Sequence, residues 1–138
     1  MSSQLKQSGL LISAENICID FSSSKNVVFR FFNKDVKETE LSKEIKINLF
    51  RVIQELTTNI TRYSSATEAS VSFRKITNNK LSLIVKDNGI GMDYDKIKKE
   101  RKVTGLKNVE RRIIFLKGTF KIESSPKKGT KWNIEIPL

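Results

Sequence analysis

The sequence contains no histidine and only one cysteine, Cys18. A single cysteine excludes a disulfide within the chain and is typical of proteins in a reducing compartment. The ligand pattern of a structural zinc site is also missing, because such sites are built from cysteine and histidine. No apolar run approaches membrane-spanning length, and residues 1–8 do not resemble a signal peptide. These absences predict a soluble cytoplasmic domain that makes no membrane contact.

The 138 residues, 38% of them hydrophobic, suffice for one domain with a buried core. With 26 basic and 15 acidic residues, the net charge is +11. Such an excess favours anionic partners, among them nucleotides, nucleic acid, acidic proteins and anionic lipids. The densest basic cluster lies in residues 96–102, where it either steers phosphates or solvates the surface.

Helical spacing of apolar residues is clearest over residues 42–63, with Ser42 as the predicted N-cap. A second helix is predicted over residues 106–116, with Gly118 as its C-cap. Ser13 can cap a short helix, although the apolar alternation that follows it is also compatible with a strand.

Alternating apolar residues between turn residues predict strands at 27–32, 69–76, 81–85, 119–123 and 132–136. Residues 1–9 are interpreted as a disordered tail or linker remnant, residues 33–40 as a charged loop and residues 93–104 as a polar loop. Residues 10–138 then form one α+β domain. We expect a two-layer sandwich whose mixed, mostly antiparallel sheet is covered on one face by helices.

The most informative stretch is the turn that follows the apolar run at 81–85. It places the carboxylate of Asp87 beside two glycines, Gly89 and Gly91, that are spaced by one residue. Glycines allow close backbone approach, and a carboxylate at a strand end can accept a hydrogen bond from an exocyclic amine such as that of adenine. The sequence Asp-Asn-Gly is also typical of an ordinary hairpin turn, so this motif alone leaves both interpretations open.

A second candidate site lies on the helix predicted at residues 42–63. Glu55 and Asn59 are four residues apart and share one helical face, and Arg62 and Tyr63 follow on or next to that face. Carboxylate and amide oxygens suit Mg²⁺, and a guanidinium suits phosphate. The alternative is a solvated polar stripe opposite the apolar face, which is the commoner meaning of this spacing.

Four motifs follow one another along the chain: Glu55-x-x-x-Asn59, Asp87-x-Gly89-x-Gly91, Gly105-Leu106-Lys107-Asn108 and Gly129-Thr130. Together they resemble the ATP-binding domain of sensor histidine kinases, which has the Bergerat fold. That superfamily is shared with gyrase-type topoisomerases, heat-shock chaperones of the ninety-kilodalton class and mismatch-repair ATPases. The surrounding sequence is most similar to nitrate-sensor and desaturase-sensor kinases, and the resemblance covers residues 9–138.

The resemblance implies a role for each residue around the base. Asp87 would accept a hydrogen bond from the adenine amine, and Thr130 would share a bound water near the same base. Tyr63 would border the base and the ribose. Gly89 and Gly91 would let the backbone turn beneath the nucleotide.

The resemblance likewise implies roles around the phosphates. Asn59 would bind Mg²⁺ with the assistance of Glu55, and Arg62 would meet the phosphates of ATP. Gly105 and Leu106 would open a helix whose N-terminal amides face those phosphates.

Residues 93–104 would be the ATP lid. Many relatives have Gly-x-Gly-Leu where this chain has Val103-Thr104-Gly105-Leu106, so one lid glycine is missing. This departure concerns the hinge of the lid and its backbone contact to phosphate, and it leaves the adenine pocket intact.

The implied function is donation of the γ-phosphoryl group of Mg-ATP to a histidine on a separate dimerisation domain, in cis or in trans. A response regulator would be the further partner. Because this chain has no histidine, it cannot carry the acceptor. The domain would be cytoplasmic, either by itself or as part of a membrane-anchored sensor.

Two other functions are compatible with the sequence. Anti-sigma-factor-type protein serine kinases have the same fold and need no histidine, although the residues after Gly105 resemble histidine kinases more. A nucleic-acid or acidic-protein binding module is the other alternative. It is disfavoured because the few aromatic residues are mostly placed as core and no binding motif is found, so nucleic acid is not an expected partner.

Overall fold

One five-stranded sheet organises the chain. The computed structural model describes residues 3–91 and 104–138. The sheet has the order β1-β2-β3-β5-β4, in which β1 and β2 are parallel and the other neighbours antiparallel. The elements are α1 (Ser3–Ser24), β1 (Val28–Lys34), the 3₁₀-helix η1 (Glu38–Glu40), α2 (Lys43–Tyr63), β2 (Glu68–Thr77), β3 (Lys80–Asp87), α4 (Thr104–Phe115), β4 (Thr119–Ser124) and β5 (Thr130–Pro137).

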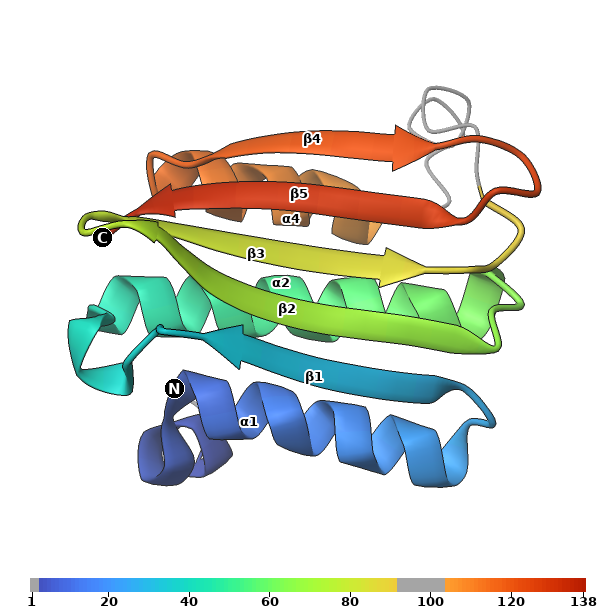
Figure 1. Ribbon diagram of the computed structural model, residues 1–138, viewed down its shortest axis with the longest axis horizontal. Coiled ribbons are helices and arrows are strands. Elements are labelled where there is room, and N and C mark those ends of the chain that lie inside the picture. Colours follow the sequence, from blue (N-terminus) through green and yellow to red (C-terminus); the bar gives the residue numbers. More distant parts are fainter. Residues whose placement is uncertain (1–2, 92–103) are drawn as a thin grey trace.

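The helices form a layer on one side of this sheet, with α2 and α4 behind the strands in Figure 1. α1 packs against β1 and α2, and α2 also packs against α4. Within residues 3–91 and 104–138, no helix lies over the opposite face of the sheet. The predicted two-layer α+β fold is thereby confirmed. None of the helices in these two ranges is long and apolar enough to cross a lipid bilayer.

The core lies between α2 and the centre of the sheet. Ser42 caps α2 as predicted, because its hydroxyl accepts a hydrogen bond from the Ile45 N–H at 3.2 Å. The apolar face predicted for this helix is buried at Ile45, Leu49, Val52, Ile53, Leu56 and Ile60. Opposite it, β3 and β5 bury the facing pairs Leu81–Ile136, Leu83–Ile134 and Val85–Trp132. This packing fixes α2 over the strands and brings its C-terminal half to the ends of β3 and β5.

The beginning of the chain differs from the sequence prediction. Residues 3–8 are helical and not a disordered tail, because Leu5 is buried at 3% exposure against the rest of the domain. The helix predicted after Ser13 is confirmed as part of α1. Ser13 does not cap it, however, and lies fully buried inside it. The spacing of residues near Ser13 could not predict the true cap of this helix, because that cap comes from a distant part of the chain.

That cap is the carboxylate of Glu38 in η1. α1 is interrupted at Gly9, whose φ of 80° lies in the left-handed region that favours glycine. Beyond this break, Glu38 accepts hydrogen bonds from the N–H groups of Leu10 at 2.8 Å and Leu11 at 3.0 Å. Lys46 of α2 forms an ion pair with the same carboxylate at 3.4 Å. The first N–H groups of this part of the helix, which have no partner within the helix, are thus bonded by a residue distant in sequence.

The end of α4 also corrects a prediction. The residue in the left-handed conformation is Lys117, with a φ of 59°, and not Gly118. Gly118 donates its N–H to the carbonyl of Ile113 at 2.9 Å. A Cβ at Gly118 would lie 2.4 Å from Cδ1 of Ile136. Glycine is therefore required here for close packing against β5.

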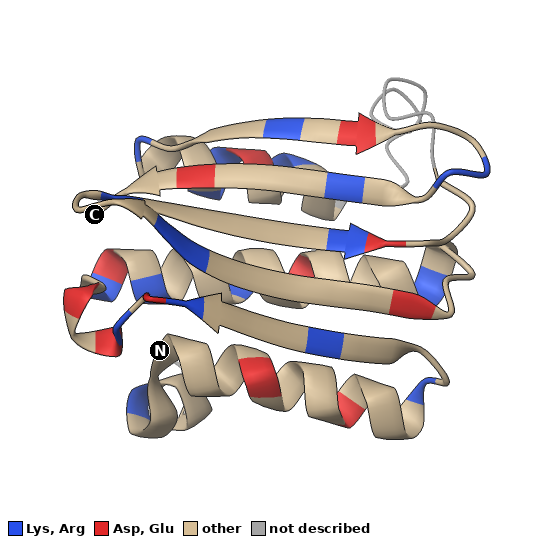
Figure 2. Cartoon of the chain, viewed as in Figure 1, with Lys and Arg blue, Asp and Glu red and all other residues tan. Residues whose placement is uncertain are grey.

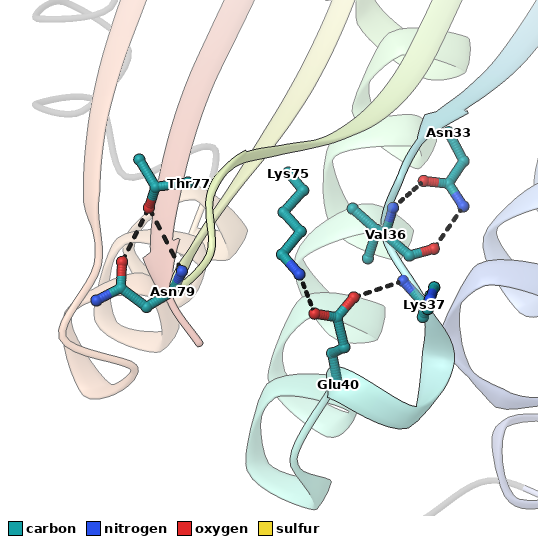
Figure 3. A network of polar contacts seen from close by, with 7 residues as sticks. All are labelled: Asn33, Val36, Lys37, Glu40, Lys75, Thr77 and Asn79. Carbon is teal, nitrogen blue, oxygen red and sulfur yellow. Dashed lines mark hydrogen bonds and ion pairs between the residues drawn. The ribbon is translucent and has the colours of Figure 1, made fainter.

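Residues 33–40, predicted as a charged loop, contain the end of β1 and all of η1. Figure 3 shows the polar contacts that order this corner. The Asn33 side chain accepts from the N–H of Val36 at 3.2 Å and donates to its carbonyl at 2.9 Å. Glu40 pairs with Lys75 of β2. The hydrogen bond from Lys75 holds the pKa of the Glu40 carboxyl below its ordinary value.

Candidate functional site

A narrow pocket lies where α2, the start of α4 and the ends of β3 and β5 meet. Its free volume is about 20 Å³. The predicted site residues Asn59, Asp87, Leu106 and Thr130 all line it, although they come from four separate elements. The remaining walls are formed by Leu56, Ile60, Ser64, Val85 and Trp132. The fold therefore gathers four of the predicted residues into one mainly apolar pocket with a few polar groups, the usual composition of a small-molecule site.

Asp87 is the acidic group of this pocket. It is the last residue of β3, and its Cα lies opposite that of Thr130, the first residue of β5. Its Oδ1 accepts a hydrogen bond from the N–H of Gly89 at 2.8 Å. Burial raises the pKa of the Asp87 carboxyl above its ordinary value, and the hydrogen bond from Gly89 opposes that rise. The second carboxylate oxygen has no hydrogen bond within the described residues, so it is available to a donor.

Thr130 is buried at 7% exposure, and its hydroxyl lies 2.7 Å from that of Ser124 on β4. The two strands that carry Asp87 and Thr130 are paired in register, so their side chains face the same side of the sheet. The pocket thus presents an acceptor and a hydroxyl side by side.

The two glycines after Asp87 are required by close backbone contacts. A Cβ at Gly89 would lie 2.2 Å from the carbonyl oxygen of Ser64, at the end of α2. The next residue, Ile90, donates its N–H to that same oxygen at 2.7 Å. Gly91 has a φ of 70°, and a Cβ there would lie 1.9 Å from the carbonyl oxygen of Ser125. The turn is thereby held between the end of α2 and the β4–β5 turn.

Asn59 carries an unsatisfied polar group into the pocket. Its side chain is partly buried, and Nδ2 has no hydrogen-bond partner within the described residues. An amide nitrogen without a partner away from water costs about 1–3 kcal/mol, which a ligand can recover. The oxygen and nitrogen of an amide can exchange places by rotation, so the group can offer either a donor or an acceptor.

Glu55, one turn earlier on α2, lies in a neighbouring cavity of about 140 Å³ between α2 and α4. A Cβ at Gly105 would lie 1.6 Å from Oε1 of Glu55, so this carboxylate rests against the first turn of α4. Arg112 lines the same cavity and donates a hydrogen bond to the Asn48 side chain at 3.0 Å. Glu55 and Asn59, both on α2, therefore line two adjoining cavities.

Two predicted residues lie apart from the pocket. Arg62 and Tyr63, in the last turn of α2, are exposed, and Tyr63 retains 55% of its surface. The predicted lid, residues 93–104, lies outside the described residues except for Thr104, which begins α4. Sequence reasoning missed the pocket walls formed by Ser64 and Trp132. The position of Ser64 directly after the predicted helix was the sequence signal that could have identified it as a pocket residue.

A cation would find few protein ligands here. Within the described residues, no three His, Cys, Asp or Glu side chains gather closely enough to hold a metal ion. The oxygen donors near the pocket are the Asn59 amide and, in the adjoining cavity, the Glu55 carboxylate. Such a sparse oxygen set suits Mg²⁺, which keeps several waters and is commonly bound through one or two protein groups together with substrate phosphates.

Comparison with known proteins gives a consistent assignment. Residues 44–138 match the family described as histidine kinase-, DNA gyrase B-, and HSP90-like ATPases. The sensor histidine kinase ComP of Bacillus subtilis is 36% identical over 98 residues, which are 71% of this chain and 13% of that protein. The sensor protein VraS of Staphylococcus haemolyticus is 31% identical over 134 residues, covering 97% of this chain and 37% of VraS. The chain thus spans well under half of the length of these relatives.

Solved structures show the same fold. The histidine kinase domain of the blue-light activated histidine kinase from Erythrobacter litoralis EL346 matches 94% of this chain and 65% of that chain. The TM-score is 0.73 at 18% sequence identity. The full-length ShkA structure in complex with AMPPNP matches 94% of this chain and 29% of that chain, with a TM-score of 0.76 at 16% identity.

Proposed function

Since the chain belongs to the family of histidine kinase-, DNA gyrase B-, and HSP90-like ATPases, we propose that it is the ATP-binding catalytic domain of a sensor histidine kinase. It binds Mg-ATP and donates the γ-phosphoryl group to a histidine on a dimerisation domain, in cis or in trans. The acceptor lies outside this chain, which contains no histidine. A response regulator then receives the phosphoryl group. The curated relatives named above are sensor kinases, and none of them favours a serine kinase.

The observation that carries this proposal is the pairing of Asp87 with Thr130 at the floor of the pocket. A carboxylate accepts from the exocyclic amine of adenine, and guanine has a carbonyl at the corresponding position of its ring. The apolar walls Leu56, Ile60 and Trp132 suit the faces of a purine. The pocket is therefore selective for adenine over guanine.

Access for the base requires movement. The free volume of about 20 Å³ is far below that of a purine. Leu106, in the first turn of α4, forms one wall of the pocket. Displacement of this turn would open the pocket between α2 and β5. Binding of the base is thus coupled to the position of α4, whose first amides face the phosphates.

The phosphates extend from the base toward α4 and the Glu55 cavity. Asn59 and Glu55 would hold Mg²⁺, with Gly105 and Leu106 supplying backbone N–H groups to the phosphates. The bound ion would neutralise charge on the phosphate oxygens. Arg62, exposed one turn after Asn59, would meet the phosphates from outside the pocket, on the side of Asn59 away from Glu55. The chain therefore contributes positioning and charge stabilisation, the two main requirements of phosphoryl transfer.

Transfer in trans tests the proposal. The purified chain is mixed with Mg-ATP labelled at the γ-phosphate and with a separately produced dimerisation domain of a related sensor histidine kinase that carries the acceptor histidine. The expected product is acid-labile, base-stable phosphohistidine on the dimerisation domain. It should be absent when the acceptor histidine is replaced by glutamine. A parallel incubation with a serine-bearing anti-sigma antagonist is the counter-test, and labelled phosphoserine there would assign the chain to the serine kinases instead.

A further inference from the structure

The face of the sheet that carries no described helix has a row of basic residues across its strands. Arg30 of β1 is the Cα partner of Ser70, Ser70 is the partner of Lys86, and Lys86 is the partner of Lys131. Residues paired in this way project from the same face of a sheet. Figure 2 shows the corresponding basic segments of β1, β3 and β5 above one another near one end of the strands. We call these four residues, three basic side chains and one serine, the basic row.

A cavity of about 450 Å³ lies over part of the basic row. Its lining is formed by Arg30, Phe32, Glu68, Ala69, Ser70, Lys86, Asp87, Asn88 and Lys128. The volume falls in the range of small-molecule sites, about 300–1,000 Å³. Phe32 keeps 53% of its surface exposed, so it offers the cavity an aromatic wall. The cavity thus combines three cationic side chains with two acidic residues and one aromatic surface, so the positive charges outnumber the negative ones by one.

Ser70 is the buried polar group of this cavity. Only 6% of its surface is exposed, and its Oγ has no hydrogen-bond partner within the described residues. A serine in mid-strand usually satisfies its hydroxyl with solvent or a neighbour. Here it lies between Arg30 and Lys86 in the register, about one strand spacing, 4.8 Å, from each. An anion that bridged the two cations would lie over the Ser70 hydroxyl and could accept its hydrogen bond.

The charges of the basic row are only partly compensated by the protein, where Glu123 of β4 is the Cα partner of Lys131. Lys86 and Lys131 are directly opposite each other, an arrangement of like charges that destabilises a sheet. Among the described residues, no carboxylate forms an ion pair with Lys86, Lys128 or Lys131. Arg30 has one loose pair, with Glu68 at 3.7 Å, in which both side chains are more than half exposed. A bound anion would supply the missing negative charge.

We propose that this cavity binds a small organic phosphate, with the phosphate between Arg30, Ser70 and Lys86 and an aromatic or planar group against Phe32. The basic row lies on the opposite face of the sheet from the pocket described above, although Asp87, at the end of β3, lines both cavities. Successive residues of a strand face opposite sides, so Lys86 points to the open face while Asp87 points toward α2. The two cavities therefore adjoin at the end of β3. The inference is independent of the function proposed above.

Phenyl phosphate is a suitable probe because it joins a phosphate to one aromatic ring. It is titrated into the uniformly ¹⁵N-labelled chain, and amide chemical shifts are followed by NMR. The expected result is saturable binding with the largest shifts at Arg30, Phe32, Ser70 and Lys86. Inorganic phosphate should bind the same residues more weakly, since it has no group to place against Phe32. Equal affinity for the two probes would contradict the aromatic part of the proposal.

Variants of the residues that would contact the phosphate test the proposal. Arg30→Gln and Lys86→Gln should each weaken phenyl phosphate at least about tenfold, the usual effect of losing a charged hydrogen bond. Ser70→Ala should weaken it by a smaller factor. The matched control is Lys121→Gln on β4, which removes one charge from the same face outside the cavity lining. This variant should stay within about twofold of the original affinity.

Four results would overturn the proposal. One is the absence of saturable binding at millimolar phenyl phosphate. A second is an equal loss of affinity in Lys121→Gln and Lys86→Gln, which would show general charge attraction. Shifts confined to Asn59, Leu106 and Thr130 would place the phosphate in the other pocket. Finally, binding of a short polyglutamate peptide without binding of phenyl phosphate would assign this face to an acidic protein partner.

Discussion

Asp87 and Thr130 lie directly opposite each other on β3 and β5, although 43 positions separate them in the sequence. The antiparallel register brings the end of one strand to the start of the other. A carboxylate with a raised pKa and a buried hydroxyl thereby meet at the pocket floor. This relationship leads to the first prediction.

Asp87→Asn should reduce ATP affinity at least about tenfold. A hydrogen bond to a charged acceptor contributes roughly 1.5–3 kcal/mol, and the neutral amide of asparagine does not replace it. The same change should raise the melting temperature in the absence of nucleotide. Burial of the carboxylate disfavours its charged form, and asparagine removes that cost while Oδ1 still accepts from Gly89. Calorimetric titration and thermal unfolding measure the two effects. Asp20→Asn, on the exposed side of α1, is the matched control and should change neither.

The affinity for ATP should fall as the solution is acidified, and the fall should begin at a higher pH than it would for an aspartate with an ordinary pKa. The pKa of Asp87 is raised in the folded state, so the carboxyl takes up its proton earlier as the pH decreases. The protonated group no longer accepts well from the adenine amine. Titrations between pH 4 and 8 measure this, with Asp87→Asn as the reference. A parallel loss of affinity in the variant would show that another group titrates.

Glu40 should contribute stability that is lost at low pH. Its folded pKa lies below the ordinary glutamate value of about 4.3. The contribution is therefore complete above that ordinary value and disappears as the pH falls through the folded pKa. Glu40→Gln should lower the urea midpoint at pH 7 and leave it nearly unchanged at pH 2.5. Glu15→Gln, exposed on α1, is the matched control and should leave the urea midpoint at pH 7 unchanged.

Gly89→Ala and Gly105→Ala form an informative pair. The new Cβ at residue 89 meets the rigid carbonyl of Ser64 at 2.2 Å, so we expect a loss of about 1–3 kcal/mol in the free energy of unfolding. At residue 105 the Cβ meets the end of the Glu55 side chain, which can rotate away. Alanine is also the better helix former, so Gly105→Ala should gain up to about 1 kcal/mol. Denaturant unfolding compares them, and equal destabilisation would contradict the contacts described.

Gly105→Ala should nevertheless reduce phosphotransfer, because the Glu55 carboxylate must leave its place beside α4. Transfer in trans to a dimerisation domain measures this effect. Full activity in a stable Gly105→Ala protein would show that Glu55 does not need its observed position.

Glu38→Ala should release the N-terminal end of α1. The substitution leaves the amides of Leu10 and Leu11 without their acceptor, at a cost of about 1–2 kcal/mol. Hydrogen exchange of these two amides should accelerate, while that of Leu49 in α2 should not. Glu38→Gln retains one acceptor oxygen and should have an intermediate effect. Unchanged protection of Leu10 in Glu38→Ala would contradict the role of this cap.

Local sequence signals predicted most of the fold, as α2 illustrates. Its apolar spacing and the Ser42 cap both lie within one stretch of chain, so the bounds agree closely with the structure. Contacts between distant segments could not be found in this way. The cap of α1 comes from Glu38, 28 positions away from Leu10. The residue with a left-handed backbone after α4 is Lys117, and Gly118 instead packs closely against Ile136.

The candidate site shows the same division. Asp87, Asn59, Leu106 and Thr130 were predicted through the order of motifs and meet in one pocket. The contact between Gly105 and Glu55 depends on how α4 lies across α2, which no local pattern specifies. Tyr63 and Arg62 were predicted to join the site because they follow Glu55 and Asn59 on or next to one helical face. In the last turn of α2, however, both side chains are exposed to solvent.

The alternation along β3 restricts how this strand can change in evolution or in engineering. The side chains of Lys86 and Asp87 project from opposite faces of the sheet, although Asp87, at the strand end, lines both cavities. A deletion of one residue between 81 and 85 would shift the register by one and exchange the two faces. The basic side chain would enter the pocket and the acidic one would reach the open surface. Length changes in this strand should therefore occur in steps of two residues or not at all.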